Sequence, residues 1–394
     1  MAGLAEPVDR ASASDGLPPS SREPRFRKKG NEDRAIFESV LLRSCPVFRQ
    51  PPTAARRCRR VTTALAMAII VAGAAFAPIG AGAETIKIGV LKVTGAAPVF
   101  VAEEEGYFAA EGVPAELFYF ESSQPIAIAV TSGAIDFGIT GFTAGFYSLA
   151  GQGVLKVISG GYAREAPGFH NQGYVASNQA YAAGFTSLKA FPGHSIGITQ
   201  IGSPPHYALG MLLDKYGLDA KTVRVLPLQS IPNMISAVSG GQADVVIMTA
   251  AATLPLVQRG DAKLLGWVGD ETPWEFGAAF TATKTANDHH DTVERFLRAW
   301  RKGTQECHDA FASADDKPAL GPAAPETLAI IAKYTGLPVD TIKLGLPYCD
   351  PEARLEVKDV LHQIAWYKAE GMLKPEIDCA AIIDKRYVVA LPER

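Results

Sequence analysis

The sequence predicts an α/β protein made of two similar lobes that follow a basic leader, and three observations support this prediction. Ile88-Gly89-Val90 recurs 108 positions later as Ile196-Gly197-Ile198, and at the same offset an Ala-Val-x-x-Gly-x-x-Asp motif occupies 129–136 and 237–244. β-type segments alternate with helical ones in both copies, which is typical of parallel sheets with crossover helices. Residues 1–83 hold 13 Lys/Arg and 7 Asp/Glu, so the other 311 residues hold 25 and 34. An acidic body of this length can bury two cores, and it is not a globally basic nucleic-acid binder.

The leader has the order of a secretory signal. Four arginines at 56–60 precede an uncharged apolar run over 61–77, and Ala81-Gly82-Ala83 supplies small residues for a signal peptidase. We therefore predict a signal peptide over 56–83, cleavage after Ala83 and a mature chain in the periplasm. An uncleaved membrane anchor is the alternative. Residues 1–55 are polar, and we predict a disordered leader or a mis-assigned start.

Each lobe repeats one order of elements. A strand opens it, a helix that stops at a glycine follows, and a second strand, a second helix and a short buried strand complete it. In the first lobe we predict strands at 85–91, 115–119 and 137–139 and a helix at 98–111 before Gly112. In the second lobe we predict strands at 195–199, 223–227 and 245–247 and a helix at 205–216 before Gly217.

The region after about Asp291 contains no third copy of the repeat. Amphipathic stretches at 291–312, 324–334 and 351–370 predict helices that pack back onto the first lobe. The body keeps three cysteines, Cys307, Cys349 and Cys379, whose odd number and wide spacing allow at most one disulfide. No His, Asp or Glu spacing is typical of a zinc or iron site, so we expect no metal and no cofactor.

Several segments resemble one family of binding proteins. They are Ile86-Lys87-Ile88-Gly89, the stretch Pro98 to Glu103, Gly106-Tyr107-Phe108, the stretch Leu188 to Gly197, and Gly241-Gln242-Ala243-Asp244. In order and spacing they resemble the opening and the repeat of extracytoplasmic solute-binding proteins of the nitrate/sulfonate/taurine (NMT1/THI5-like) type, which serve ABC importers. The resemblance covers about Thr85 to Trp274.

This resemblance implies a periplasmic binding protein type II clamshell, in which two hinge strands join the lobes. Lobe one would combine 84–176 with 278–394, lobe two would span 177–277, and 173–177 and 278–283 are the candidate hinge strands. It also implies a monomer that performs no catalysis, binds a small-molecule ligand in the cleft and delivers it to an ABC permease in the inner membrane. Contacts from both lobes would favour the closed state.

Ligands of parallel α/β sheets bind beyond the carboxyl ends of the strands, and this rule selects the candidate site residues. Small residues after the first strand would expose N–H groups to an anion. Ser203 is a candidate helix cap, and Arg164 a candidate partner for an acid, unless neighbouring Glu165 already neutralises it. The full set is Thr94, Gly95, Ala96, Phe142, Thr143, Tyr162, Arg164, Gln200, Gly202, Ser203, His206, Gln229, Thr249 and Trp274.

These amides, hydroxyls and rings favour a small organic anion such as a sulfonate or an aromatic carboxylate. One alternative is thiamine-pyrimidine precursor binding or synthesis, since fungal enzymes with this fold hold pyridoxal phosphate on a lysine, and Lys92 is the only lysine in these loops. Another alternative is a periplasmic ligand sensor. Ordinary structural roles compete at every position, because a cap or a core ring needs no ligand.

Overall fold

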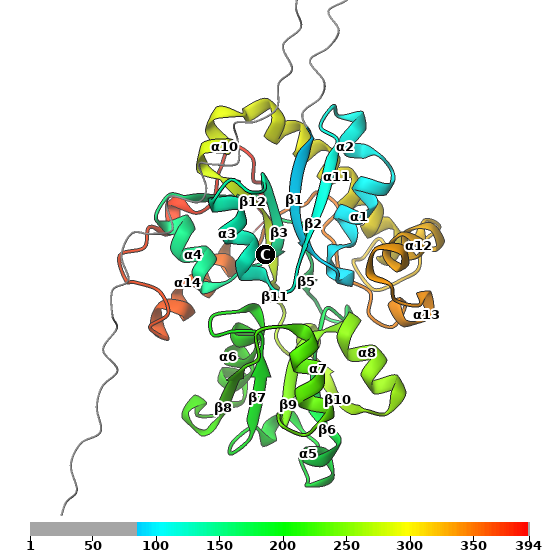
Figure 1. Ribbon diagram of the computed structural model, residues 1–394, viewed down its shortest axis with the longest axis vertical. Coiled ribbons are helices and arrows are strands. Elements are labelled where there is room, and N and C mark those ends of the chain that lie inside the picture. The colour runs from blue at the N-terminus through cyan, green and yellow to red at the C-terminus, as the bar shows by residue number, and fades with distance from the viewer. Residues whose placement is uncertain (1–84, 393–394) are drawn as a thin grey trace, which may run out of the picture. The chain divides into compact units, whose positions relative to one another are not determined.

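The computed structural model describes residues 85–392, which form two five-stranded sheets with helices packed against them (Figure 1). The predicted leader and signal peptide lie outside the described residues. The helices are α1 (Ala97–Glu104), α2 (Tyr107–Ala110), α3 (Ser123–Thr131), α4 (Ala144–Gly151), α5 (Asn178–Ala182), α6 (Pro204–Tyr216), α7 (Ile231–Ser239), α8 (Ala250–Arg259), α9 (Val268–Glu271), α10 (Thr283–Asp288), α11 (His290–Phe311), α12 (Ala324–Thr335), α13 (Val339–Ile342) and α14 (Val357–Ala369).

The two sheets have the same topology. The first has the order β2-β1-β3-β12-β4, and the second has the order β8-β7-β9-β6-β10, with β12 and β6 antiparallel to their neighbours. The first sheet contains β1 (Ile86–Leu91), β2 (Ala115–Phe120), β3 (Phe137–Gly141), β4 (Leu155–Ser159) and β12 (Gly277–Ala282). The second contains β6 (Gln172–Ser177), β7 (Ser195–Ile198), β8 (Arg224–Pro227), β9 (Val245–Thr249) and β10 (Ala262–Trp267). The predicted two-lobed α/β architecture is confirmed.

The sequence repeat reflects identical strand registers. Ile88 pairs with Phe137 in the first sheet, and Ile196 pairs with Val245 in the second, so both partners move by 108 positions. The repeat aspartates have matching roles. Asp136 Oδ2 accepts the backbone N–H of Lys87, Asp244 Oδ2 accepts that of Ser195, and both distances are 2.8 Å. Each aspartate therefore ties the end of its repeat to the start of the strand that opens the lobe.

The first predicted helix is divided in the structure. α1 ends at Glu104 and α2 begins at Tyr107, because Gly106 adopts a left-handed conformation with φ of 67°. Only glycine takes this conformation without a steric cost, so the break is encoded at that residue. The second predicted helix is confirmed as α6, which ends at the left-handed Gly217.

The expected hinge segments lie inside the sheets. β6 is flanked by β9 and β10 in the second sheet, and β12 is flanked by β3 and β4 in the first. The two chain crossings instead pass through β5 (Arg164–Glu165) and β11 (Trp274–Glu275), which pair antiparallel as a separate two-stranded ladder. β6 therefore belongs with the second sheet, although the expected lobe boundary placed most of it in lobe one.

The C-terminal helices contact both lobes, whereas packing on the first lobe alone was expected. The ring of Trp366 on α14 fills the space beside Gly210 of α6, and Tyr207 Oη lies 2.7 Å from His362 Nδ1. On the same helix, Tyr367 packs near Tyr147 of α4, with ring centroids 5.9 Å apart. Thr341 of α13 donates to Gln258 of α8 over 3.3 Å. The last hundred residues thus hold the two lobes together from two sides.

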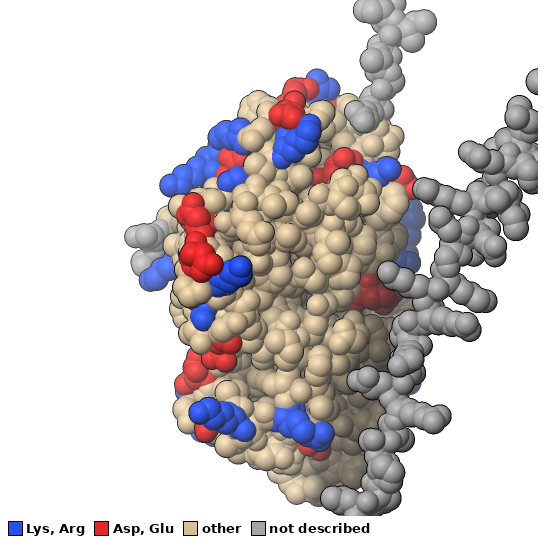
Figure 2. All heavy atoms as spheres, turned by 60° about the vertical axis from the view of Figure 1, so that its left-hand side comes forward, with Lys and Arg blue, Asp and Glu red and all other residues tan. Residues whose placement is uncertain are grey.

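The charged side chains form no single-sign area on the face drawn in Figure 2, where basic and acidic residues lie next to each other. Within residues 85–392, every helix is too short or too polar to cross a membrane.

Candidate functional site

A small cavity lies where the carboxyl ends of the parallel strands of both sheets meet. Its volume is about 30 Å³, which corresponds to roughly two water molecules. One part of its lining is polar: Glu121, Ser122, Ser123, Gln172, Thr199 and Thr249. The other part is apolar: Leu91, Pro204, Pro205, Ile231, Met234, Ile247, Met248 and Phe276. Because the lining comes from both lobes, a ligand in this cavity would touch both of them.

Two helices direct uncapped N-termini to this cavity. α3 follows Ser122 and α8 follows Thr249, and neither hydroxyl accepts a hydrogen bond from the first turn of its helix. The free N–H groups of a first turn and the helix dipole both favour an anion. α6 also begins here, but its first two residues, Pro204 and Pro205, have no N–H to donate. The cavity therefore combines two donor ends with an apolar wall.

Two polar atoms in the cavity lining lack partners. The Oγ1 atom of Thr249 and the Oε1 atom of Gln172 are buried without a hydrogen bond to any described residue. Leaving a buried polar atom unpaired costs about 1–3 kcal/mol. Such groups are therefore candidates for contact with a bound molecule.

The loop 200–203 joins the two lobes directly. Gln200 Nε2 donates to Ser122 Oγ over 3.2 Å, and the N–H of Ala144 donates to the carbonyl of Gly202 over 2.8 Å. Gly202 has a φ of 75°, and a Cβ there would lie 2.7 Å from the Cβ of Ala144. The lobes thus approach each other at a position that only glycine fits.

His206 and Thr143 have structural partners at the starts of their helices. Nδ1 of His206 accepts the N–H of Gly202 over 3.0 Å, and burial lowers the pKa of this histidine to about 4. Thr143 Oγ1 accepts the N–H of Phe146 over 2.9 Å and so caps α4. Neither residue lines the cavity. Ser203 is buried beside it, and its Oγ has no partner among the described residues.

The predicted aromatic residues lie in the core around the cavity. Phe142 packs against Phe146 and Tyr147, with ring centroids 5.3 and 5.2 Å apart. Tyr162 packs against Phe276, which itself lines the cavity. Trp274 is 1% exposed and packs against Tyr207 of α6, with centroids 4.8 Å apart.

The remaining candidates lie outside the cavity lining. Thr94, Gly95 and Ala96 form a short 3-10 turn before α1, and this turn is buried. A Cβ on Gly95 would lie 2.8 Å from Oδ1 of Asn171. This turn is therefore packed against the segment between β5 and β6, which is one of the two crossings between the lobes. Gln229 is exposed with a φ of 72°, and its side chain donates to the carbonyl of Pro227 over 3.4 Å.

The β5–β11 ladder contains two buried acids. Arg164 pairs with Glu356 at 3.2 Å rather than with its neighbour Glu165, because successive side chains of a strand point to opposite faces. Burial raises the pKa of Glu165 and of Glu275 to about 8 in each case. Asn171 Nδ2 donates to Glu165 over 2.9 Å, and the N–H of Glu356 donates to Glu275 over 3.1 Å. Both acids are therefore mainly protonated at neutral pH.

Five polar cavity residues are absent from the set predicted from the sequence: Glu121, Ser122, Ser123, Gln172 and Thr199. The repeat contains a signal for Ser122, because the offset of 108 maps it onto Ser230, which directly follows the candidate residue Gln229. The predicted set contains no residue from the loop after β2. Gln172 begins a strand that had been considered a hinge, so its side chain was not considered.

A wider hollow of about 770 Å³ lies beside α11. Its lining mixes Arg301, Lys302, Glu306, Asp309 and Glu352, and it is far more open than the cavity between the lobes. It does not lie at the strand ends, so the fold gives it no special role. Within residues 85–392, no His, Cys, Asp and Glu side chains gather in a metal-binding arrangement.

Two sheets of identical topology, joined by two crossings and enclosing a cavity at their strand ends, define a two-lobed ligand-binding fold. The chain belongs to the NMT1-like family, which matches residues 80–316. No curated protein sequence matches the chain.

Solved structures share this fold at low sequence identity. The alkanesulfonate-binding protein SsuA from Xanthomonas axonopodis pv. citri, bound to MOPS, is 17% identical with a TM-score of 0.61, covering 76% of this chain and 98% of SsuA. The periplasmic nitrate-binding protein NrtA from Synechocystis PCC 6803 is 14% identical with a TM-score of 0.61, covering 77% and 86%. The desulfurization enzyme DSZB is 12% identical with a TM-score of 0.54, covering 78% and 96%. These similarities show the fold, which hosts both binding proteins and an enzyme.

Proposed function

We propose that this protein is the extracytoplasmic substrate-binding component of an ABC importer and that it captures a small organic anion between its lobes. The observation that carries the proposal is the cavity at which the uncapped N-termini of α3 and α8 meet. Two proteins with a similar fold, SsuA and NrtA, bind alkanesulfonates and nitrate, and this supports an anion as the ligand here.

The cavity lining favours an anion with an apolar body. The N–H groups and hydroxyls near Ser122 and Thr249 would hold the acidic group, while Met234, Met248 and Phe276 would contact the rest. Methionine side chains adapt to irregular ligand shapes. Glu121, an exposed carboxylate, also reaches the cavity and would repel each negative charge of a ligand, so a dianion would be disfavoured more than a monoanion. We therefore propose a monoanion such as a sulfonate or an aromatic carboxylate.

Ligand entry requires movement of the lobes, because about 30 Å³ does not hold an organic anion. Opening would break the contacts of loop 200–203 with Ser122 and Ala144. We propose that the ligand restores closure by bridging the lobes, and that the closed form is recognised by a permease in the inner membrane.

We also propose that the protein performs no catalysis. Lys92, the residue required by the pyridoxal alternative, is exposed, and its Nζ lies 4.5 Å from the ring centroid of Tyr119. It does not line the cavity. The mature chain would begin at Glu84, remain free in the periplasm and act as a monomer, with the boundary between its lobes at the β5 and β11 crossings.

The test is a thermal-shift screen of the exported protein with alkanesulfonates, nitrate, aromatic carboxylates and thiamine pyrimidines. A ligand at 100 times its Kd adds about 2.7 kcal/mol to the free energy of unfolding. Thr249→Val removes an unpaired hydroxyl from the cavity, so it should weaken binding about tenfold without lowering the melting temperature of the free protein.

Thr253→Val is the control, because Thr253 lies in the first turn of α8, four residues after Thr249, is buried and does not line the cavity. Its hydroxyl donates to the carbonyl of Met248 over 3.3 Å and is not directed to a ligand. This control should leave the affinity unchanged. A response to pyrimidines alone would contradict the anion proposal. A folded protein that responds to none of these ligands would contradict the proposed ligand class.

A further inference from the structure

Two buried cysteines meet within the first lobe, away from the cavity. Cys307 lies near the end of α11, and Cys349 lies in the segment between α13 and α14. They are 0% and 2% exposed, and both are free thiols in the structure. Both belong to an apolar cluster that includes Phe311, Leu328 and Ile342.

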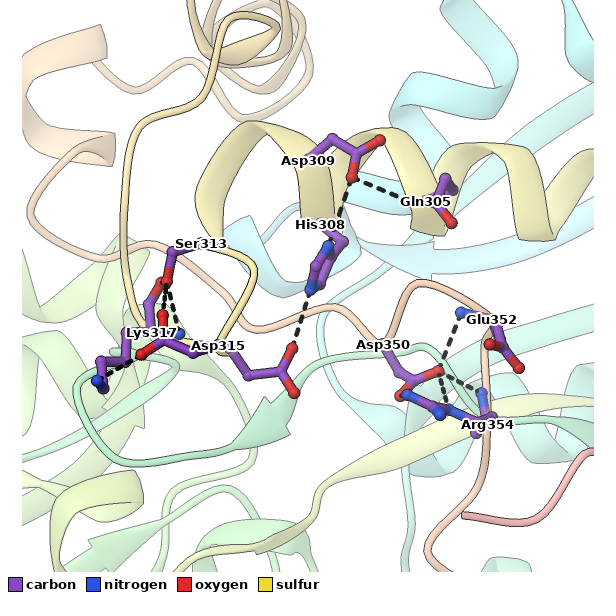
Figure 3. Close-up of polar contacts among 10 residues, drawn as sticks. Gln305, His308, Asp309, Ser313, Asp315, Lys317, Asp350, Glu352 and Arg354 are labelled. Carbon is purple, nitrogen blue, oxygen red and sulfur yellow. Dashed lines mark hydrogen bonds and ion pairs between the residues drawn. The ribbon is translucent and has the colours of Figure 1, made fainter. Parts of the chain in front are cut away.

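The neighbours of both cysteines are fixed in place. The rings of His308 and Tyr348 meet edge to face with centroids 6.3 Å apart. The segment 307–308 therefore lies opposite the segment 348–349. On the following turn, Asp350 accepts the N–H of Arg354 over 2.9 Å and binds its guanidinium with both carboxylate oxygens (Figure 3). His308 Nε2 lies 3.0 Å from Asp316 Oδ1 on the other side. The segments that carry the two thiols are thus anchored by contacts outside the pair.

The third cysteine of the body has a different environment. Cys379 is partly exposed, and its Sγ lies 3.7 Å from Nζ of Lys368 and from the carbonyl oxygen of Ile377. It therefore serves as an internal comparison for the buried pair.

We propose that Cys307 and Cys349 form a disulfide bond in the exported protein. The reaction joins the two Sγ atoms and removes both thiol protons and two electrons. The acceptor is a disulfide oxidant of the extracytoplasmic space, whose own S–S bond is reduced to two thiols. Disulfides persist in such compartments. The proposal uses the extracytoplasmic location of the proposed function but not its ligand.

The bond would form during folding. Burial and the neighbouring thiol raise the pKa of Cys307, which disfavours the thiolate needed for exchange once the lobe is complete. It would link positions 307 and 349, which are 42 residues apart. A closed loop of this length should raise the melting temperature by about 5–10 °C.

The bond would also affect the crossing between the lobes. The carbonyl of Tyr348, next to Cys349, accepts the N–H of Arg164 on β5 over 3.3 Å. A disulfide would therefore anchor one strand of the β5–β11 ladder to α11.

The experiment maps disulfides in two samples: protein exported from a Gram-negative host, and full-length chain refolded from the reduced state in a glutathione buffer. Free thiols are alkylated in denaturant, and the protein is digested with trypsin without reductant. The expected product is peptide 303–333 linked to peptide 344–354, with Cys379 alkylated. Cys349→Ala should abolish the linked peptide and the effect of reductant on the melting temperature, whereas Cys379→Ala should preserve both.

Free thiols at both positions in the refolded, folded protein would overturn the proposal. A linked peptide in the refolded sample alone would show that the two thiols can pair but would overturn the bond in the exported protein. The ligand screen does not involve the cysteines, so it tests the proposed function separately.

Discussion

Glu275 offers a direct test of the buried acids in the crossing between the lobes. Its side chain is 3% exposed, lies opposite Arg164 in the β5–β11 pairing, and accepts the N–H of Glu356. Burial outweighs the nearby guanidinium and raises its pKa to about 8. The folded protein therefore holds a proton that the unfolded chain releases above a pH of about 4.5.

The direction of the pH dependence follows from this difference. Because the folded pKa exceeds the unfolded one, the stabilisation is complete below about pH 4.5 and is lost as the pH rises through about 8. The free energy of unfolding should fall by up to about 1.4 kcal/mol per pH unit for this group inside that window. Glu165, with a similar pKa, adds to the slope. Glu275→Gln keeps a neutral side chain at every pH, so it should roughly halve the slope and be more stable than wild type at pH 8.

The assay is urea unfolding of both proteins at pH 5, 6, 7 and 8. Glu116→Gln, which replaces an exposed carboxyl on β2, is the control and should keep the wild-type slope. Equal slopes for wild type and Glu275→Gln would refute the reasoning, because they would mean that Glu275 is ionised in the folded protein.

Two further predictions concern the repeat and the contact between the lobes. Asp136→Ala and Asp244→Ala should each lower the free energy of unfolding, measured by chemical denaturation, by about 1.5–3 kcal/mol. The reason is that each removes a charge-assisted hydrogen bond to a strand N–H. An effect at only one position would contradict the equivalence of the lobes. Gly202→Ala should lower the free energy of unfolding by about 1–3 kcal/mol and lower the melting temperature, because the φ of Gly202 is positive and a Cβ would contact Ala144. An unchanged melting temperature would show that this approach of the lobes is not needed for stability.

The repeat explains how much of the fold could be predicted from the sequence. Gly133 and Gly241 both adopt positive φ at the ends of their helices, and an aspartate three residues later binds the first strand of its lobe. The glycine and the aspartate are close in sequence, so their spacing is visible as a repeated motif. The division between α1 and α2 is not predicted, because the left-handed conformation of Gly106 falls inside a segment whose apolar spacing favours one continuous helix.

The crossings and the C-terminal contacts were not predictable in the same way. β6 and β12 are apolar on both faces because they lie inside sheets, and an apolar extended segment does not reveal whether it crosses between lobes or pairs within one. Trp366 contacts α6 across about 150 positions of sequence, and no local pattern encodes such a contact. The cavity residues follow the strand-end rule, yet which hydroxyl caps a helix and which stays unpaired depends on tertiary packing.

The position of β12 determines when each lobe can be completed during synthesis. The strands of the second sheet are continuous in the chain from 172 to 267, so this sheet can close as soon as that stretch has left the ribosome or the export channel. The first sheet must wait, because β12 (residues 277–282) lies between β3 and β4 and carries the pairing between them. The N-terminal lobe is therefore the last to finish, and β3 and β4 keep open edges in the interim. Those edges are where a nascent chain would need protection against aggregation.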